Sequence, residues 1–187
     1  MQDEKLRERL DARTSIYNGH VINLEKWDVT LPNGKPAMRE VAIHKGASAI
    51  VPVDDEGYVY LVRQFRTPLQ RVLTEVPAGK LDSAGEDHLV AAKRELHEET
   101  GFTAKKWTHL VDLATTPGFC TETISLYLAE GLTRGETDFD DDEFLDLVRM
   151  PLNEAVRTAL TGGFEDAKTI AALLLAAHAL KGEGAPC

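Results

Sequence analysis

Three glutamates that lie close together in the sequence, Glu95, Glu98 and Glu99, are the residues best suited to carry chemistry. On an α-helix, positions three and four residues apart share a face, so these carboxylates would crowd together and repel each other. A Mg²⁺ ion prefers carboxylate oxygens and substrate phosphates, and it would turn this repulsion into a binding site. Arg94 is adjacent and suited to hold a carboxylate through a bidentate pair, and Glu86 would extend the acidic ridge upstream.

The same residues have a second interpretation, because an acidic helix that also contains arginine is usually no more than a solvated face. The surrounding pattern favours the metal site. A glycine loop that starts at Gly79 precedes the helix, Glu86 lies eight residues before Arg94, and the segment ends in Gly101-Phe102. A glycine after the last helical turn is typical of a helix end.

This arrangement resembles the signature of the Nudix hydrolase family: a glycine, five residues, a glutamate, seven residues, then Arg-Glu-aliphatic-x-Glu-Glu-x-Gly-aliphatic. The chain departs from the signature at two places. Six residues separate Gly79 from Glu86, and Phe102 stands where an aliphatic residue is usual. The extra residue falls in the turn 82–85, where loops absorb insertions best, and it leaves the spacing from Glu86 to Gly101 intact.

Further segments resemble the branch of this family that contains the ADP-ribose pyrophosphatases, and the similarity extends from about Val41 to Leu180. The segments are Val62–Arg66, Glu75–Asp82, Thr116–Phe119 and Lys168–Ile170. The resemblance implies hydrolysis of the pyrophosphate link of a nucleoside diphosphate joined to another group. ADP-ribose would give AMP and ribose 5-phosphate, and a nucleotide sugar such as GDP-mannose would give a nucleoside monophosphate and a sugar 1-phosphate. The alternatives are a dinucleotide or coenzyme substrate, and a catalytically inactive module that binds ADP-ribose.

The resemblance also implies a set of metal ligands. Glu95 and Glu99 would bind Mg²⁺, with Mn²⁺ as the alternative, together with the backbone carbonyl of Ala78. Glu98 would bind a further metal ion or help to activate water. A carboxylate bound to a cation is a poor proton acceptor, so the general base is expected elsewhere. Related enzymes carry a catalytic glutamate on a loop at the position of Glu136–Glu143, where Glu143 is the first choice, Asp141 the second, and a solvated turn the alternative.

Substrate contacts are expected from two arginines at the end of an apolar strand, Arg63 and Arg66. They share a side-chain direction only if that strand is irregular, and Arg66 is the stronger choice for the phosphate or ribose. By resemblance, Arg39 would contribute from a partner subunit and Glu122 would contact the second ribose. Phe119 would stack on a base or line the pocket, with a place in the core as the alternative.

Hydrophobic patterning supplies the elements that must position these residues. Extended segments around a turn at 31–35 fit Tyr17–His44, and two apolar runs separated by Asp54-Asp55-Glu56-Gly57 predict a hairpin. We expect helices at Asp3–Ala12, Glu86–Thr100, Leu152–Leu160 and Ala167–Leu180, and strands at Ala47–Val53, Tyr58–Gln64, Val72–Val76, Trp107–Ala114, Ile124–Glu130 and Phe144–Met150. The fold class is therefore α/β, a Nudix-type α/β/α sandwich with a mixed sheet. It carries an N-terminal antiparallel β-segment that is expected to exchange in a homodimer, so residues 1–45 would serve dimerisation and residues 46–187 hydrolysis.

Composition indicates which classes of ligand to expect and in which compartment the protein works. The net charge is −10 and no basic run occurs, so we expect a small nucleoside diphosphate compound as ligand, with neither nucleic acid nor membrane as a partner. The chain has two cysteines, Cys120 and Cys187, and a highly charged N-terminal stretch without an apolar run. Both features favour a reducing cytoplasm.

Overall fold

The computed structural model describes residues 3–83, 85–135 and 144–182, and the chain divides into two compact units. Unit 1 comprises residues 1–46 and 114–122, and unit 2 comprises residues 47–113 and 123–187. No helix in the described part of the chain is long and apolar enough to cross a membrane.

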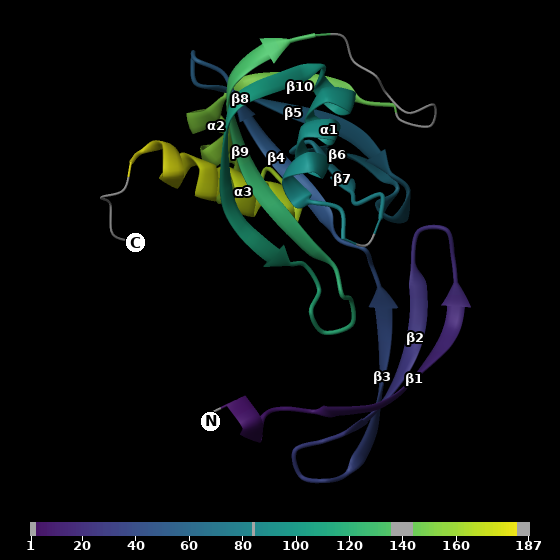
Figure 1. The fold of residues 1–187 in the computed structure, drawn as a ribbon. Helices are drawn as coiled ribbons and strands as arrows, with labels where there is room; N and C mark the ends of the chain where they lie inside the picture. The colour runs from purple at the N-terminus through teal and green to yellow at the C-terminus, as the bar shows by residue number, and fades with distance from the viewer. Residues whose placement is uncertain (1–2, 84, 136–143, 183–187) are drawn as a thin grey trace. The chain divides into compact units, whose positions relative to one another are not determined.

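Unit 1 is built on a three-stranded antiparallel sheet in the order β1-β2-β3 (Figure 1). The segment 114–122 joins this sheet, because Ala42 donates a backbone hydrogen bond to Phe119 and accepts one from Thr121. The elements are a short 3₁₀ helix at Asp3–Lys5 and the strands β1 (Arg9–Asn18), β2 (Asn23–Thr30) and β3 (Pro36–Ile43).

The predicted helix at Asp3–Ala12 is wrong. Its expected apolar stripe, Leu6 and Leu10, is 79% and 41% exposed, so tertiary packing does not bury the two leucines together as an amphipathic helix requires. From Arg9 the chain instead pairs with β2, and Asp11 accepts a hydrogen bond from Thr30 at 2.6 Å. Cross-strand partners therefore decide the conformation of this segment.

Unit 2 is a mixed seven-stranded sheet covered on both faces, which confirms the predicted α/β/α sandwich. The central strand β4 pairs in parallel with β9 and antiparallel with β5. The strands are β4 (Ala47–Val53), β5 (Tyr58–Arg66), β6 (Arg71–Glu75), β7 (Ala78–Lys80), β8 (Phe102–Ala114), β9 (Thr123–Arg134) and β10 (Asp146–Pro151). The helices are a 3₁₀ turn at Thr67–Leu69, then α1 (His88–Thr100), α2 (Leu152–Leu160) and α3 (Ala167–Leu180).

The core of unit 2 follows from the alternation of side chains along β4. Helices α2 and α3 cover one face of the sheet and α1 covers the other (Figure 1). Ala49, Val51 and Val53 pack with residues of α2 and α3, whereas Ile50 packs with Ala92 and Leu96 of α1. All seven residues of β4 are buried, as expected of a strand covered by helices on both sides. This rigid centre holds β7 and α1, which carry the candidate site.

Candidate active site

Helix α1 presents the three glutamates of the acidic motif. Its first turn is capped by Asp87, whose carboxylate accepts two backbone N–H groups at 2.9 and 3.0 Å, and its end is closed by Gly101 with φ 71°. Glu95 and Glu99 are 7% and 4% exposed, while the side chain of Glu98 is 29% exposed. The helix therefore holds two carboxylates at the protein interior and a third at its rim. Uncompensated burial of such charges is costly, so each needs a partner.

Strand β7 lies against these carboxylates. The backbone N–H of Ala78 donates a hydrogen bond to Glu99 Oε2 at 3.1 Å. Gly79 pairs with Ser48 of β4, and the carboxylate of Glu95 occupies the space that a β-carbon at position 79 would fill. A glycine is thus required here by close packing, and its backbone brings the Ala78 peptide next to the two buried carboxylates.

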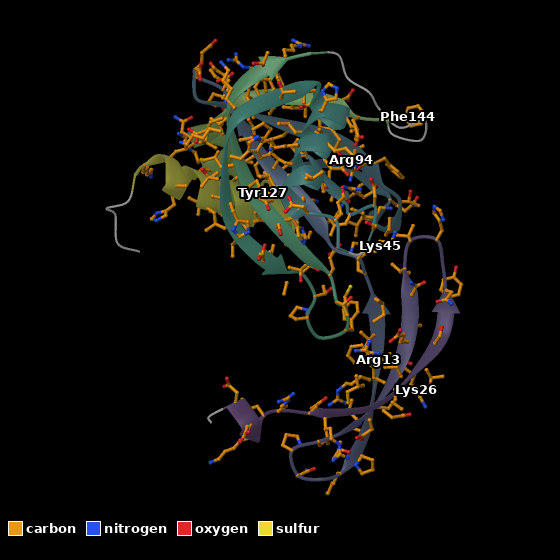
Figure 2. All side chains as sticks on the ribbon, viewed as in Figure 1. Arg13, Lys26, Lys45, Arg94, Tyr127 and Phe144 are labelled. Atoms are coloured by element: carbon orange, nitrogen blue, oxygen red, sulfur yellow. The ribbon has the colours of Figure 1, made fainter. Side chains whose placement is uncertain are left out.

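Arg94 joins the rest of the acidic group. Its Nη1 donates to Glu95 Oε1 at 2.7 Å and to Glu98 Oε2 at 3.1 Å, and its Nη2 donates to the carbonyl of Lys80 at 3.2 Å. The carboxylate of Glu86 lies 3.7 Å from Nη2. Burial alone would lower the pKa of Arg94, but its carboxylate neighbours, Glu95 first, raise it. Arg94, labelled on α1 in Figure 2, therefore remains charged and orders the carboxylates around it. Glu86 reaches this group from the loop before the helix rather than from α1 itself.

A second charged group is centred on Glu75. Arg66 forms a bidentate pair with Glu75, at 2.7 Å from Nε and 2.8 Å from Nη2, and Lys168 of α3 also donates to Glu75. The hydrogen bonds that Arg66 donates to Glu75 raise the pKa of Arg66 most, and the negative charges of Glu75, Glu99 and Asp166 raise it further. The structure therefore places two cations, Arg66 and Lys168, around one buried carboxylate close to the acidic motif.

The model of the NUDIX domain matches residues 42–173 of this chain. The chain belongs to the Nudix hydrolase family. It is 42% identical over 172 residues to an ADP-ribose pyrophosphatase of Bacillus subtilis (strain 168), and the matched region covers 91% of this chain and 92% of the relative. It is 41% identical over 172 residues to a methanol dehydrogenase activator of Bacillus methanolicus, with 90% and 92% covered. A crystal structure of an ADP compounds hydrolase superposes with a TM-score of 0.82 at 27% identity, covering 96% of this chain and 97% of that chain.

Nudix hydrolases need a divalent metal ion, and the donor set on α1 and β7 fits one. Glu95, Glu98, Glu99 and the carbonyl of Ala78 offer the oxygen ligands that hard cations take. Among the described residues, no three His, Cys, Asp or Glu side chains are already arranged around a common metal position. In this structure Arg94 donates a hydrogen bond to each of Glu95 and Glu98. A cation bound by those two carboxylates would have to share them with Arg94.

The two arginines of β5 point in different directions. Residues 62–66 of β5 pair with β6 without a register shift, so Arg63 and Arg66 project to opposite faces of the sheet. Arg66 is close enough to Glu99 for the charge of that carboxylate to raise its pKa, whereas Nη1 of Arg63 is 3.6 Å from Asp146 of β10. Of the two expected substrate contacts, the structure brings Arg66 to the carboxylates.

Three further expected substrate contacts belong to unit 1. Arg39 and Phe119 both line a cavity of about 300 Å³ in this unit, together with Trp27. Phe119 is 59% exposed, so it is not a core residue. Glu122 accepts a hydrogen bond from Thr115 at 2.7 Å, and its carboxylate lies 3.5 Å from His44. The expected bases Glu143 and Asp141 lie outside the described residues.

The sequence did not predict the pairing of Glu75 with Lys168. Glu75 and Lys168 appeared only within segments that resemble the family, and they are 93 residues apart. The one available signal was a lysine near the start of an otherwise apolar helix. A buried cation at such a position requires an anionic partner, but the sequence did not indicate which one.

Proposed function

We propose that this chain hydrolyses the pyrophosphate bond of ADP-ribose or of a nucleoside diphosphate sugar with the help of Mg²⁺. The observation that carries the proposal is the pair of buried carboxylates, Glu95 and Glu99, packed against the Ala78-Gly79 peptide. Glu95 also contacts Arg94, but these groups together keep a negative excess that would repel a diphosphate unless a cation intervened. The similarity to ADP-ribose pyrophosphatase makes ADP-ribose the first substrate to test.

In this proposal the protein mainly positions its reactants. A divalent cation held by Glu95, Glu98, Glu99 and the Ala78 carbonyl supplies charge that neutralises the phosphates and increases the acidity of water. Arg66, anchored by Glu75, donates a hydrogen bond to a phosphate oxygen. Water attacks one phosphorus, the bond from that phosphorus to the bridging oxygen breaks, and the bridging oxygen leaves with the other phosphate. ADP-ribose then gives AMP and ribose 5-phosphate.

The proton of the attacking water must go to a carboxylate. We assign it to Glu143 first and Asp141 second, because a cation bound at α1 would occupy the carboxylates of that helix and weaken them as bases. Glu98 is the alternative base, since its side chain is the most exposed of the three glutamates on α1.

The decisive experiment is a product assay with ADP-ribose, GDP-mannose and a dinucleotide, run with Mg²⁺ on the wild type, Glu99→Gln and Glu154→Gln. Glutamine still accepts the N–H of Ala78, so Glu99→Gln should fold but lose at least about a hundredfold in kcat, as for one lost electrostatic contact. Glu154→Gln makes the same chemical change at an exposed position of α2 and should retain wild-type turnover. Equal rates for Glu99→Gln and the wild type at saturating Mg²⁺ would refute the site. Binding of ADP-ribose without turnover by the wild type would favour an inactive binding module.

We also infer that unit 1 packs against a second copy of the chain. All ten residues of β1 are exposed, including Leu10, Ile16 and Tyr17. An exposed strand at a sheet edge with apolar side chains favours pairing with another chain. Light scattering should show a dimer at micromolar concentration for the wild type and a monomer for Ile16→Glu. A fully active wild-type monomer would contradict this proposal.

A further inference from the structure

The start of α3 is tied to the backbone just before β7 through one buried hydroxyl. Thr169 is fully buried, and its Oγ1 accepts the backbone N–H of Val76 at 2.9 Å. The same hydroxyl donates to Asp166 Oδ2 at 2.5 Å, and the backbone N–H of Thr169 donates to that oxygen at 2.9 Å. Because the hydroxyl of Thr169 donates its hydrogen bond to Asp166, a lone pair of Oγ1 is left to accept the N–H of Val76.

A second contact from α3 joins the residues that precede Thr169 and Val76 in the chain, which are Lys168 and Glu75. Lys168 donates to Glu75 Oε2 and, at 3.0 Å, to Asp166. The side chain of Glu75 is 2% exposed and is held from its other side by Arg66. Burial alone would raise the pKa of Glu75, but Arg66 and Lys168 lower it to about 2. The first turn of α3 thus fixes both the side chain of residue 75 and the backbone of residue 76.

These contacts complete the hold on the segment that leads into the candidate metal site. Pro77 accepts a backbone hydrogen bond from Ile50 at 2.9 Å, and Ala78 donates to Glu99. Two residues, Val76 and Pro77, lie between Glu75 and Ala78. Proline has no backbone N–H, so the backbone donor of this pair is the N–H of Val76, and Val76 is buried. Thr169 is its partner. Without the hydroxyl, that N–H would be buried and unsatisfied, and the segment would shift to relieve it.

We propose that Thr169 is a positioning residue for the metal site. Its hydrogen bond to Val76 holds the Ala78 peptide in place for the cation and for Glu99. This inference rests on the proposed function, because it assigns the Ala78 carbonyl to the metal. Thr169 itself touches neither substrate nor metal. It acts through Val76, two residues before Ala78, and Lys168 supports it through Glu75.

The test compares Thr169→Val with Thr169→Ser. Valine keeps the shape of threonine and removes the hydroxyl, whereas serine keeps the hydroxyl and removes a methyl group. Loss of a group that orients a metal ligand typically weakens metal binding by about 10–100-fold. Thr169→Val should therefore raise the Mn²⁺ concentration for half-saturation at least about tenfold, and Thr169→Ser should stay within about twofold of the wild type.

Three measurements separate this role from simple packing. Electron paramagnetic resonance reports Mn²⁺ binding by the protein without substrate, the Mg²⁺ dependence of ADP-ribose hydrolysis reports the working enzyme, and amide exchange reports the N–H of Ala78. The proposal expects Thr169→Val to weaken metal binding and to speed exchange at Ala78 as well as at Val76. If Thr169→Val lowers the melting temperature but keeps wild-type Mn²⁺ affinity and wild-type exchange at Ala78, Thr169 only stabilises the fold and the proposal is overturned.

A second pair of variants covers the case in which Thr169→Val does not fold. Lys168→Met removes the cation next to Glu75 and should raise the Mn²⁺ half-saturation several-fold. Lys181→Met removes the same charge from the exposed far end of α3 and should change nothing. Equal Mn²⁺ affinity for both lysine variants would overturn the proposal. A wild type that binds Mn²⁺ but does not hydrolyse ADP-ribose would refute the proposed substrate alone, because the metal measurements on the variants stand independently of turnover.

Discussion

A single methyl group at position 79 should disable the active site while the fold survives. In Gly79→Ala the new β-carbon would overlap the carboxyl carbon and both oxygens of Glu95. That carboxylate cannot easily move away, because its side chain is 9% exposed and Arg94 Nη1 holds Oε1 at 2.7 Å. Gly79 itself has no positive φ, so the effect is purely steric.

The expected loss in kcat follows from the contact that Glu95 would lose with the cation. If the methyl displaces the carboxylate from the cation, one preorganised electrostatic contact is lost, which corresponds to about 10²–10³ in kcat. Inserting a methyl into a well-packed site also costs about 1–3 kcal/mol of stability. The variant should therefore melt at a lower temperature yet remain folded at 25 °C, with its main defect in turnover.

The matched control is Gly57→Ala in the turn between β4 and β5. Gly57 has φ +81° and open space around its missing β-carbon. Alanine there costs about 1–2 kcal/mol through backbone strain, without touching the site. ADP-ribose turnover and thermal melting of both variants should show a kinetic defect only in Gly79→Ala. If Gly79→Ala keeps more than about a tenth of the wild-type kcat at saturating Mg²⁺, Glu95 does not act from the position described here.

Two further predictions concern a buried charge and the base. The pKa of Glu75 is lowered from 4.5 to about 2, so its stabilisation is present above about pH 4.5 and is lost as the pH falls toward 2. This pKa difference corresponds to about 3 kcal/mol of stability. In urea unfolding, Glu75→Gln should therefore lose less of its free energy of unfolding between pH 5 and pH 3 than the wild type does. The same pH dependence of the free energy of unfolding in both proteins would contradict the assignment. Glu143→Gln should lower kcat by about 10²–10⁴ with little change in Mg²⁺ affinity. If Glu143→Gln and Asp141→Asn each keep more than half of the activity while Glu98→Gln abolishes it with metal binding intact, the base lies on α1.

The elements that depend on local signals were predictable from the sequence. The helices at Leu152–Leu160 and Ala167–Leu180 have the predicted bounds, and the hairpin of β4 and β5 turns at Gly57 as expected. The helix of the acidic motif ends at Thr100 as predicted and begins at His88, two residues after the predicted start, because Asp87 caps it. Periodicity, caps and turn residues act over a few positions, so they can be recognised without knowledge of the fold.

The N-terminal segment shows where local signals fail. The spacing of Leu6 and Leu10 suits a helix, but pairing of β1 with β2 prevails. The short strand β7 was not predicted, because three residues that include a glycine carry no strand pattern. Its conformation depends on pairing with β4 and on the carboxylate of Glu95 behind it.

For the active site, the sequence alone determined which carboxylates share one face of a helix, because helical geometry follows directly from the spacing of Glu95, Glu98 and Glu99. Only the tertiary structure decided what surrounds them. The sheet sends Arg63 and Arg66 to opposite faces, and the packing of α3 brings Lys168 to Glu75 and Thr169 to Val76, each across 93 residues. Contacts at that separation are set by how helices and strands pack, and nothing in the neighbouring residues of either partner specifies them.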